Sequence, residues 1–318
     1  MKRLNAVLGL LLMGVFIVSL TIGKVWIAPH DWLTDSPARW IITELRLPRA
    51  VLGVTIGATL GMSGAVLQGY LRNPLADPSL VGISSSAALG AVIAIAFGWA
   101  FSPALLFLCA MLGAVGATLL LVGLTRINSS PMSFILGGMV LSSLAGALVA
   151  FIISMAPNPF AVSEILTWLM GALTDRSWDD VSRALPLMVI GCGILAITAR
   201  PLDVLSLGSD VVQTLGINLK HLQWVLVLGL GLGIGASVAV SGVVGFVGLI
   251  VPHVMRMWVG ERPSALLLPS ALGGAILVVA ADSLVRLSPG AGEVRLGVVM
   301  ALIGAPFFFG LLLRGRTE

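Results

Sequence analysis

The sequence predicts an all-α polytopic membrane protein with about ten transmembrane helices, organised as a single domain over residues 1–318. Hydrophobic residues make up 58% of the chain and charged residues only 10%, whereas about 25% of the residues of an average soluble protein are charged. The mean hydropathy is +1.08. The 38 glycines and 16 prolines agree with this class, because transmembrane helices tolerate both better than soluble helices do.

Apolar runs separated by polar turns give the expected helices in order. The N-terminal run resembles a signal peptide, but its apolar core is long and Lys24 and Trp26 follow it in place of a cleavage site, so we expect a retained first span. A polar loop with a short helix then runs to Arg46-Leu47-Pro48-Arg49, and residues 157–183 form a later polar excursion. The first six expected spans cover residues 5–26, 50–69, two spans within 78–125 that break near Phe101-Ser102-Pro103, 132–155 and 184–199.

Residues 200–221 interrupt this pattern with a polar, partly helical segment between two spans. The segment is too long and too regular for a simple connector, and basic residues flank it. Four spans follow it, and ten spans in total place both termini on the same side of the membrane. The later spans cover residues 222–241, a shorter element that ends near 253–256, 264–282 and 297–313.

The charged residues orient the chain, which has a net charge of +4. With the N-terminus inside, the inner segments hold ten basic and five acidic residues and the outer segments eight basic and nine acidic residues. The positive-inside rule therefore predicts cytoplasmic termini and a cytoplasmic segment 200–221, and it explains the basic charge without nucleic acid. Cys109 and Cys192 lie in apolar runs without metal-ligand spacing.

Two motifs resemble those of other classes of protein. Gly61-Met62-Ser63-Gly64 matches the GxSG motif of rhomboid proteases, with His253 as the possible base. However, Ser63 belongs to a stripe of small residues every four positions over residues 53–69, which predicts close helix packing, and an intramembrane serine protease is the weaker alternative. The alternating glycines of residues 229–235 imitate a dinucleotide fingerprint but lie inside an uncharged span.

Ionisable residues within spans are functional candidates by default, and there are few. Asp282 and Arg286 lie one turn apart at the outer end of a span, a spacing that predicts a local ion pair. No series of Asp, Glu or His crosses the middle of the membrane. This disfavours an ion-coupled secondary transporter, which stays an alternative, and favours a pore whose energy comes from a partner.

Several motifs then carry a resemblance to a known family, in the expected order from about residue 26 to the C-terminus. The chain resembles the permease subunits of the iron-chelate and vitamin B12 ABC importers (FecCD/BtuC-type permeases). The motifs are Arg46-Leu47-Pro48-Arg49, Gln68-Gly69, Arg72-Asn73-Pro74-Leu75-Ala76-Asp77-Pro78, Leu80-x-Gly82, Trp168-Leu169-Met170-Gly171, Leu207-Gly208, Leu215-Gly216, Gly245 to His253 with Arg256, Ala281-Asp282-x-x-x-Arg286, and Gly297 to Phe307.

The resemblance implies a type II ABC importer permease in a bacterial inner membrane that moves a ferric siderophore, haem or cobalamin. Two permease copies, as a homodimer or with a sister permease, would surround one pathway. Two ATP-binding subunits with ATP and Mg²⁺ would lie beneath them, and a periplasmic binding protein would deliver the substrate. The chain itself would be no enzyme and would hold no cofactor or metal.

The resemblance also implies roles for individual residues. Arg46, Arg49 and Arg286 would dock the binding protein through bidentate bonds to carboxylates, and Arg295 either adds a docking charge or pairs with Glu293 or another nearby acid. Segment 200–221 would couple to the ATPase, and Ser209 stands where many members carry an acid. The coupling residues would be Leu207, Gly208, Ser209, Asp210, Gln213, Leu215 and Gly216, and the cytoplasmic gate would lie at Ser130, Pro131 and Met132.

Overall fold

The computed structural model describes residues 2–32, 37–127, 130–208, 212, 214–288 and 293–314. In these ranges the chain forms helices and the turns between them, with no strand. Among the same residues, seven helices are long and apolar enough to cross a membrane, and four shorter apolar helices accompany them. The all-α polytopic fold expected from the sequence is confirmed.

Ten helices stand where the ten spans were expected, with smaller elements between them. The ten are α1 (Lys2–Thr21), α3 (Leu47–Leu71), α4 (Ile83–Ala96), α5 (Pro103–Ile127), α6 (Pro131–Ser154), α8 (Trp178–Ile197), α11 (Leu219–Ser241), α12 (Val247–Val259), α13 (Pro263–Arg286) and α14 (Leu296–Arg314). The smaller elements are η1 (Pro29–Trp32), α2 (Pro37–Trp40), η2 (Ile41–Arg46), η3 (Pro78–Val81), η4 (Trp99–Phe101), α7 (Pro159–Leu169) and α9 (Ala199–Leu205).

Two of the expected span ends are wrong. The first helix ends at Thr21 and not at Trp26, because the last carbonyl groups of a helix need donors and the Arg46 guanidinium supplies them at Leu20 and Thr21. The sixth span begins at Trp178 and not at residue 184. There the Asp180 carboxylate accepts a 3.0 Å hydrogen bond from the Ser177 backbone N–H, which caps the earlier start.

The expected break before the second span is also absent, because the chain is helical from α2 through η2 into α3. Pro48 has no N–H and cannot continue the regular hydrogen-bond ladder. A π-turn over Ile41–Arg46 absorbs the defect, and the Leu47 N–H bonds to the Ile42 carbonyl five residues back. Arg46 is the last residue of this turn, and Arg49 lies in the first turn of α3.

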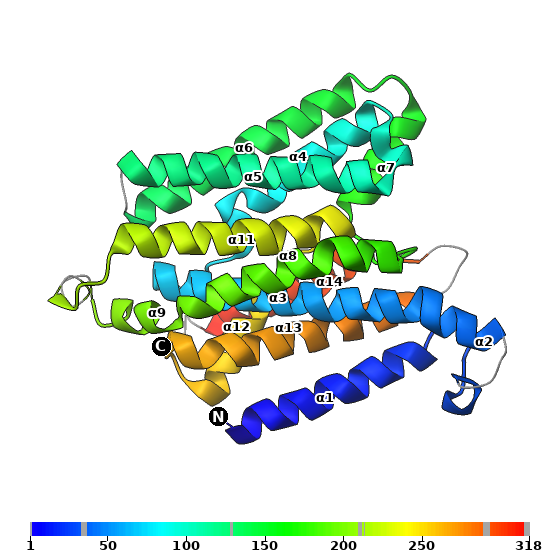
Figure 1. The fold of residues 1–318 in the computed structure, drawn as a ribbon, viewed down its shortest axis with the longest axis horizontal. Coiled ribbons are helices and arrows are strands. Elements are labelled where there is room, and N and C mark those ends of the chain that lie inside the picture. Colours follow the sequence, from blue (N-terminus) through cyan, green and yellow to red (C-terminus); the bar gives the residue numbers. More distant parts are fainter. Residues whose placement is uncertain are drawn as a thin grey trace.

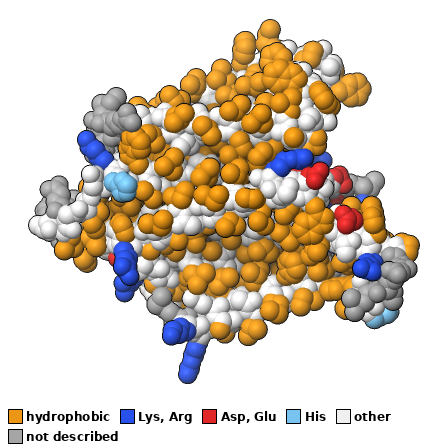
Figure 2. Space-filling view, in the orientation of Figure 1, with side chains coloured by type: hydrophobic (Ala, Val, Ile, Leu, Met, Phe, Trp, Pro, Cys, Tyr) orange, Lys and Arg blue, Asp and Glu red, His pale blue; other side chains and the backbone are white. Residues whose placement is uncertain are grey.

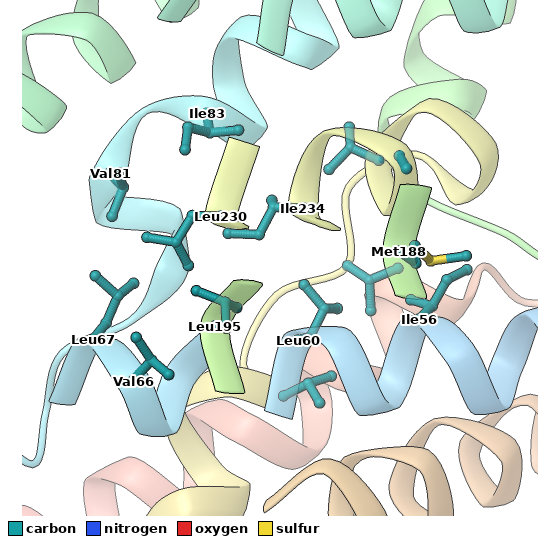
Figure 3. Close-up of a cluster of buried hydrophobic side chains, with 14 of the residues drawn as sticks. Ile56, Leu60, Val66, Leu67, Val81, Ile83, Met188, Leu195, Leu230 and Ile234 are labelled. Carbon is teal, nitrogen blue, oxygen red and sulfur yellow. The ribbon is translucent and has the colours of Figure 1, made fainter. Parts of the chain in front are cut away.

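Helix α3 lies at the centre of the bundle, between α13 on one side and α8 and α11 on the other (Figure 1). In Figure 3 Ile56 of α3 lies beside Met188 of α8, and Leu60 lies toward Leu195 of α8, all buried. The stripe of small residues on α3 permits close contact with α13. A Cβ atom at Gly57 would lie 2.3 Å from the Gly274 carbonyl oxygen, so the packing interpretation of this stripe is confirmed.

The two ends of the bundle carry different features. The start of α1, the end of α14 and α9 lie together at the left of Figure 1, and α2, α7 and the turn before α8 lie at the right. Basic side chains gather at the left end in Figure 2, and acidic side chains appear at the right end. The left end is therefore the one that the sequence predicts to be cytoplasmic.

Candidate functional sites at the two ends of the bundle

The end of the bundle opposite the predicted cytoplasmic one is here called the outer end. It holds a group of five buried or half-buried charged residues, here called the arginine cluster: Arg46, Arg49, Asp282, Arg286 and Glu293. Its centre is Asp282, which is 2% exposed. Arg49 donates from Nε to both carboxylate oxygens of Asp282 at 3.0 Å and from Nη2 at 2.8 Å. Arg286 donates to the same carboxylate from Nε at 3.0 Å and also from Nη2. The local ion pair expected between Asp282 and Arg286 is confirmed.

Further donors of these arginines bind carbonyl groups of α1 and of the segment that follows it. Arg286 Nη1 donates to the Ser19 carbonyl at 2.9 Å. Arg46 Nη1 donates to the carbonyls of Leu20 and Thr21 at 2.7 and 2.8 Å, and its Nη2 donates to the Val25 carbonyl. The arginines proposed for docking therefore also join the outer ends of α1, α3 and α13.

Glu293 is the second acid of the cluster, and sequence reasoning did not assign it there. Arg49 holds it in a bidentate pair, from Nη1 to Oε1 at 3.2 Å and from Nη2 to Oε2 at 2.8 Å. The Thr174 hydroxyl donates a third bond of 3.0 Å to Oε2. Burial alone would raise the pKa of Glu293, but the hydrogen bonds and the charge of Arg49 lower it below its ordinary value.

A cavity of about 290 Å³ opens beside the cluster. The three guanidinium groups of the cluster face only two carboxylates, so one positive charge is in excess within it. The positive lining residues of the cavity outnumber the acidic ones, and this arrangement suits a carboxylate or another anion of a partner. The charged lining residues are Lys24, Arg46, Arg49, Asp175, Arg176, Arg286 and Glu293.

Arg295 lies apart from the arginine cluster. It is half-buried and lines a second outer cavity of about 250 Å³ together with Glu164, Trp168 and Arg176. Glu293, which sequence reasoning considered as its possible partner, is bound by Arg49 instead. The docking role of Arg295 stays a prediction.

At the opposite end, α9 begins the segment 200–221 and is fastened to α13. Asp203 accepts 2.7 Å bonds from Arg262 Nε and the Ser264 hydroxyl, and a 2.8 Å bond from the Ser264 backbone N–H. Asp203 thus caps the N-terminus of α13 from another helix. Burial opposes the charged form, but the bonds from Ser264 and Arg262 lower the pKa of Asp203. Sequence reasoning did not single out this residue.

The described coupling residues form an exposed surface. Leu207 and Leu215 are 68% and 61% exposed, and Gly208 and Gly216 beside them have φ angles of +116° and +71°. Such angles favour glycine, so both leucines stand at turns that hold them away from the core. The predicted coupling residues Ser209, Asp210 and Gln213 lie outside the described residues.

A cavity of about 620 Å³ lies beside this surface. Ser206 and Leu207 line it together with Arg72 and Arg256. Gln68 forms part of its wall and is 1% exposed. Its Nε2 donates to the carbonyls of Ala76, Gly248 and Leu249 at 3.3 to 3.4 Å, and these bonds connect α3 with its following loop and with α12.

The predicted gate residues begin α6 at the same end of the bundle. The Ser130 hydroxyl accepts a 3.1 Å hydrogen bond from the Ser133 backbone N–H, and Pro131 occupies the first position of the helix. Both features start a helix. Met132 is 66% exposed, and the gate role of the three residues stays a prediction.

The described residues form no serine protease site, no dinucleotide site and no metal site. The Ser63 hydroxyl is buried without a hydrogen-bond partner, so it is not paired with His253. The glycines of residues 229–235 pack against other helices, for example Gly231 against Thr118 and Gly235 against Ala114. No group of three His, Cys, Asp or Glu side chains in the described ranges could hold a metal ion.

Comparisons with known proteins cover nearly the whole chain. The profile of the FecCD transport family matches residues 11–314. The "Cobalamin import system permease protein BtuC" of Halobacterium salinarum is 39% identical over 291 residues, which is 90% of this chain and 76% of that protein. The "Vitamin B12 import system permease protein BtuC" of Vibrio cholerae is 38% identical over 312 residues, which is 97% of this chain and 93% of that protein.

Solved structures agree with these relatives. One, described as an inward-facing conformation of a proposed metal-chelate type ABC transporter, superposes with a TM-score of 0.90 and 34% identity, covering 99% of this chain and all of that one. PsaBC from Streptococcus pneumoniae in complex with Fab superposes with a TM-score of 0.54 at 16% identity, covering 88% of this chain and 92% of that one. The second likeness concerns the fold alone.

Proposed function

The chain belongs to the FecCD transport family, and we propose that it is the permease subunit of an ATP-driven importer that carries cobalamin or another metal chelate into the bacterial cytoplasm. Relatives that are 38–39% identical are named as cobalamin or vitamin B12 import permeases, which supports cobalamin as the first substrate to test. We place the chain in the inner membrane with both termini in the cytoplasm, as its charge distribution suggests.

The observation that carries the proposal is the exposed surface at Leu207 and Leu215. Large apolar side chains at the water-facing end of a membrane protein mark a surface for a protein partner. Asp203 fastens the preceding helix α9 to the start of α13. A force applied at this surface would therefore reach a membrane-spanning helix through buried contacts and hydrogen bonds. A pair of ATP-binding subunits fits this arrangement.

The outer end supports a second partner, a periplasmic binding protein with acidic side chains. The arginine cluster has one positive charge in excess, and basic residues outnumber acidic ones in the lining of the adjoining cavity. Arg49 and Arg286 are both bound to Asp282, so reversing their charge would disrupt the helix ends as well as any docking. A docking test therefore needs variants that leave Asp282 and its two arginines intact.

Complex formation with the ATP-binding subunits tests the proposal. We expect Leu207→Asp to abolish co-purification of the ATP-binding subunits with the permease, because it places a charge in an apolar contact. Phe160→Asp adds the same charge to an exposed apolar side chain of α7, at the opposite end of the bundle, and serves as the control. Equal recovery of the ATP-binding subunits with wild type and Leu207→Asp would contradict the proposed surface.

A further inference from the structure

We propose that Glu293 occupies, from within the chain, the place on Arg49 that an acidic side chain of the docked binding protein takes, and that this exchange releases the start of α14. The inference rests on the proposed function, because it requires a partner that docks through acidic side chains. The proposed docking role says where the binding protein attaches to the permease. The exchange at Arg49 says how this attachment acts on the permease.

The two carboxylates on Arg49 differ in how firmly they are held. The Asp282 side chain is 3% exposed, belongs to α13 and is shared with Arg286. The Glu293 side chain is 18% exposed and belongs to the turn before α14. Removing Asp282 would leave the buried Arg286 guanidinium without a carboxylate partner and would take one of two carboxylates from Arg49, which is strongly unfavourable. Glu293 is therefore the carboxylate that an external one can replace.

The geometry of the Glu293 pair is the one that an incoming carboxylate would adopt. Both oxygens face the two Nη atoms of Arg49, at 3.2 and 2.8 Å, which is the bidentate arrangement preferred between Arg and a carboxylate. Glu293 and Arg49 line the same outer cavity as Arg46. The excess charge of the cluster can attract the partner first, and the exchange at Arg49 then follows.

Replacement of Glu293 would act on α14, because this residue stands three positions before the helix begins. Besides Arg49, it binds the Thr174 hydroxyl in the turn before α8. The start of α14 also touches that turn through a 3.4 Å hydrogen bond from the Gly297 N–H to the Gly171 carbonyl. Further along the helix, Leu302 is 69% exposed. The start of α14 is packed in the core, where Leu296 and Met300 are 1% and 0% exposed, so loss of the Glu293 bonds would remove a polar contact that positions this end of the helix.

Binding of the cobalamin-loaded binding protein from the same genome to the permease complex in lipid nanodiscs tests the exchange. We expect Glu293→Gln to tighten binding about tenfold, because a charge-assisted competitor is removed. The matched control is Glu164→Gln, an exposed acid on α7, which changes the net charge of the outer face equally without touching Arg49. A Glu293→Gln affinity equal to that of Glu164→Gln, or weaker than wild type, overturns the inference.

Thr174→Val provides a second variant with no change in charge, should Glu293→Gln fold poorly. It removes one hydrogen bond from Glu293 and should tighten binding about threefold; unchanged binding speaks against the exchange.

Spin labels at Val298→Cys and Asp179→Cys, with both native cysteines replaced, report the position of α14. In wild type, the distance between the two labels should change when the binding protein is added. In Glu293→Gln, the distance should already be changed without the binding protein. An unchanged distance in both proteins refutes the release of α14. No binding to any form, wild type included, instead overturns the proposed function.

Discussion

Arg49 and Asp282 lie 233 positions apart in the sequence, and hydrogen bonds of 2.8 to 3.0 Å between their side chains join α3 to α13. Asp282 binds Arg286 as well. One buried carboxylate therefore serves two guanidinium groups at the outer end of the bundle. Water is largely excluded there, so loss of the carboxylate would not be compensated by hydration. The arginine cluster is thus a structural element before any partner arrives.

The first prediction concerns Asp282→Asn. We expect a loss of stability of about 3–5 kcal/mol, because two buried guanidinium groups lose their shared counter-charge. Thermal unfolding of the detergent-solubilised protein, followed by tryptophan fluorescence, measures the change. Asp179→Asn is the control, since that side chain is 81% exposed. Equal unfolding temperatures for the two variants would show that the cluster does not stabilise the fold.

A second prediction concerns the contact between α3 and α13. Gly57→Ala would place a Cβ atom 2.3 Å from the Gly274 carbonyl oxygen, so the helices must move apart, at a cost of about 1–3 kcal/mol or more. Gly146→Ala on α6 meets nothing within 4 Å and should be neutral. Monodispersity on size exclusion and the unfolding temperature provide the measurement. A Gly57→Ala protein as stable as Gly146→Ala would contradict the packing described.

Glu293 gives a pH-dependent prediction. Its pKa is lowered from 4.5 in the folded chain, so its bond to Arg49 stabilises the fold above the unfolded pKa and is lost as the pH falls through the lower folded value. Wild type should unfold at a higher temperature than Glu293→Gln at about pH 7, and the two should converge as the pH falls through the lowered pKa of Glu293. Glu164→Gln should match wild type at neutral pH. A wild-type advantage that persists unchanged in acid would exclude this titration as its source.

Asp203 yields a prediction about coupling. Asp203→Ala removes the bonds to Arg262 and to both donors of Ser264. The cap contributes about 1 kcal/mol, so the permease should still fold and bind its ATP-binding subunits. The number of substrate molecules moved per ATP hydrolysed should fall several-fold, because α9 no longer transmits movement to α13. Arg200→Gln, an exposed neighbour, should keep the wild-type ratio, and an unchanged ratio in Asp203→Ala would remove α9 from the coupling path.

The positions of the spans could be predicted because each depends on a local apolar run, and the stripe on α3 predicted its close packing. Two of the errors lie where distant residues decide. Helix α1 ends at Thr21 because a guanidinium 25 positions away binds its last carbonyl groups. Glu293 was considered as a partner of Arg295, two residues along, whereas Arg49 binds it from 244 positions away. Local spacing cannot reveal such pairs.

Uptake by proteoliposomes tests the central claim most directly. The permease, its ATP-binding subunits and its binding protein are reconstituted with ATP inside, and radiolabelled cobalamin is supplied outside. We predict accumulation that requires ATP and the binding protein, and that stops when the catalytic glutamate of the ATP-binding subunit is replaced by glutamine. Ferric siderophore and haem in parallel vesicles identify the substrate if cobalamin is not taken up. Uptake of any of these that continues undiminished on a proton gradient alone, without ATP, would contradict the account.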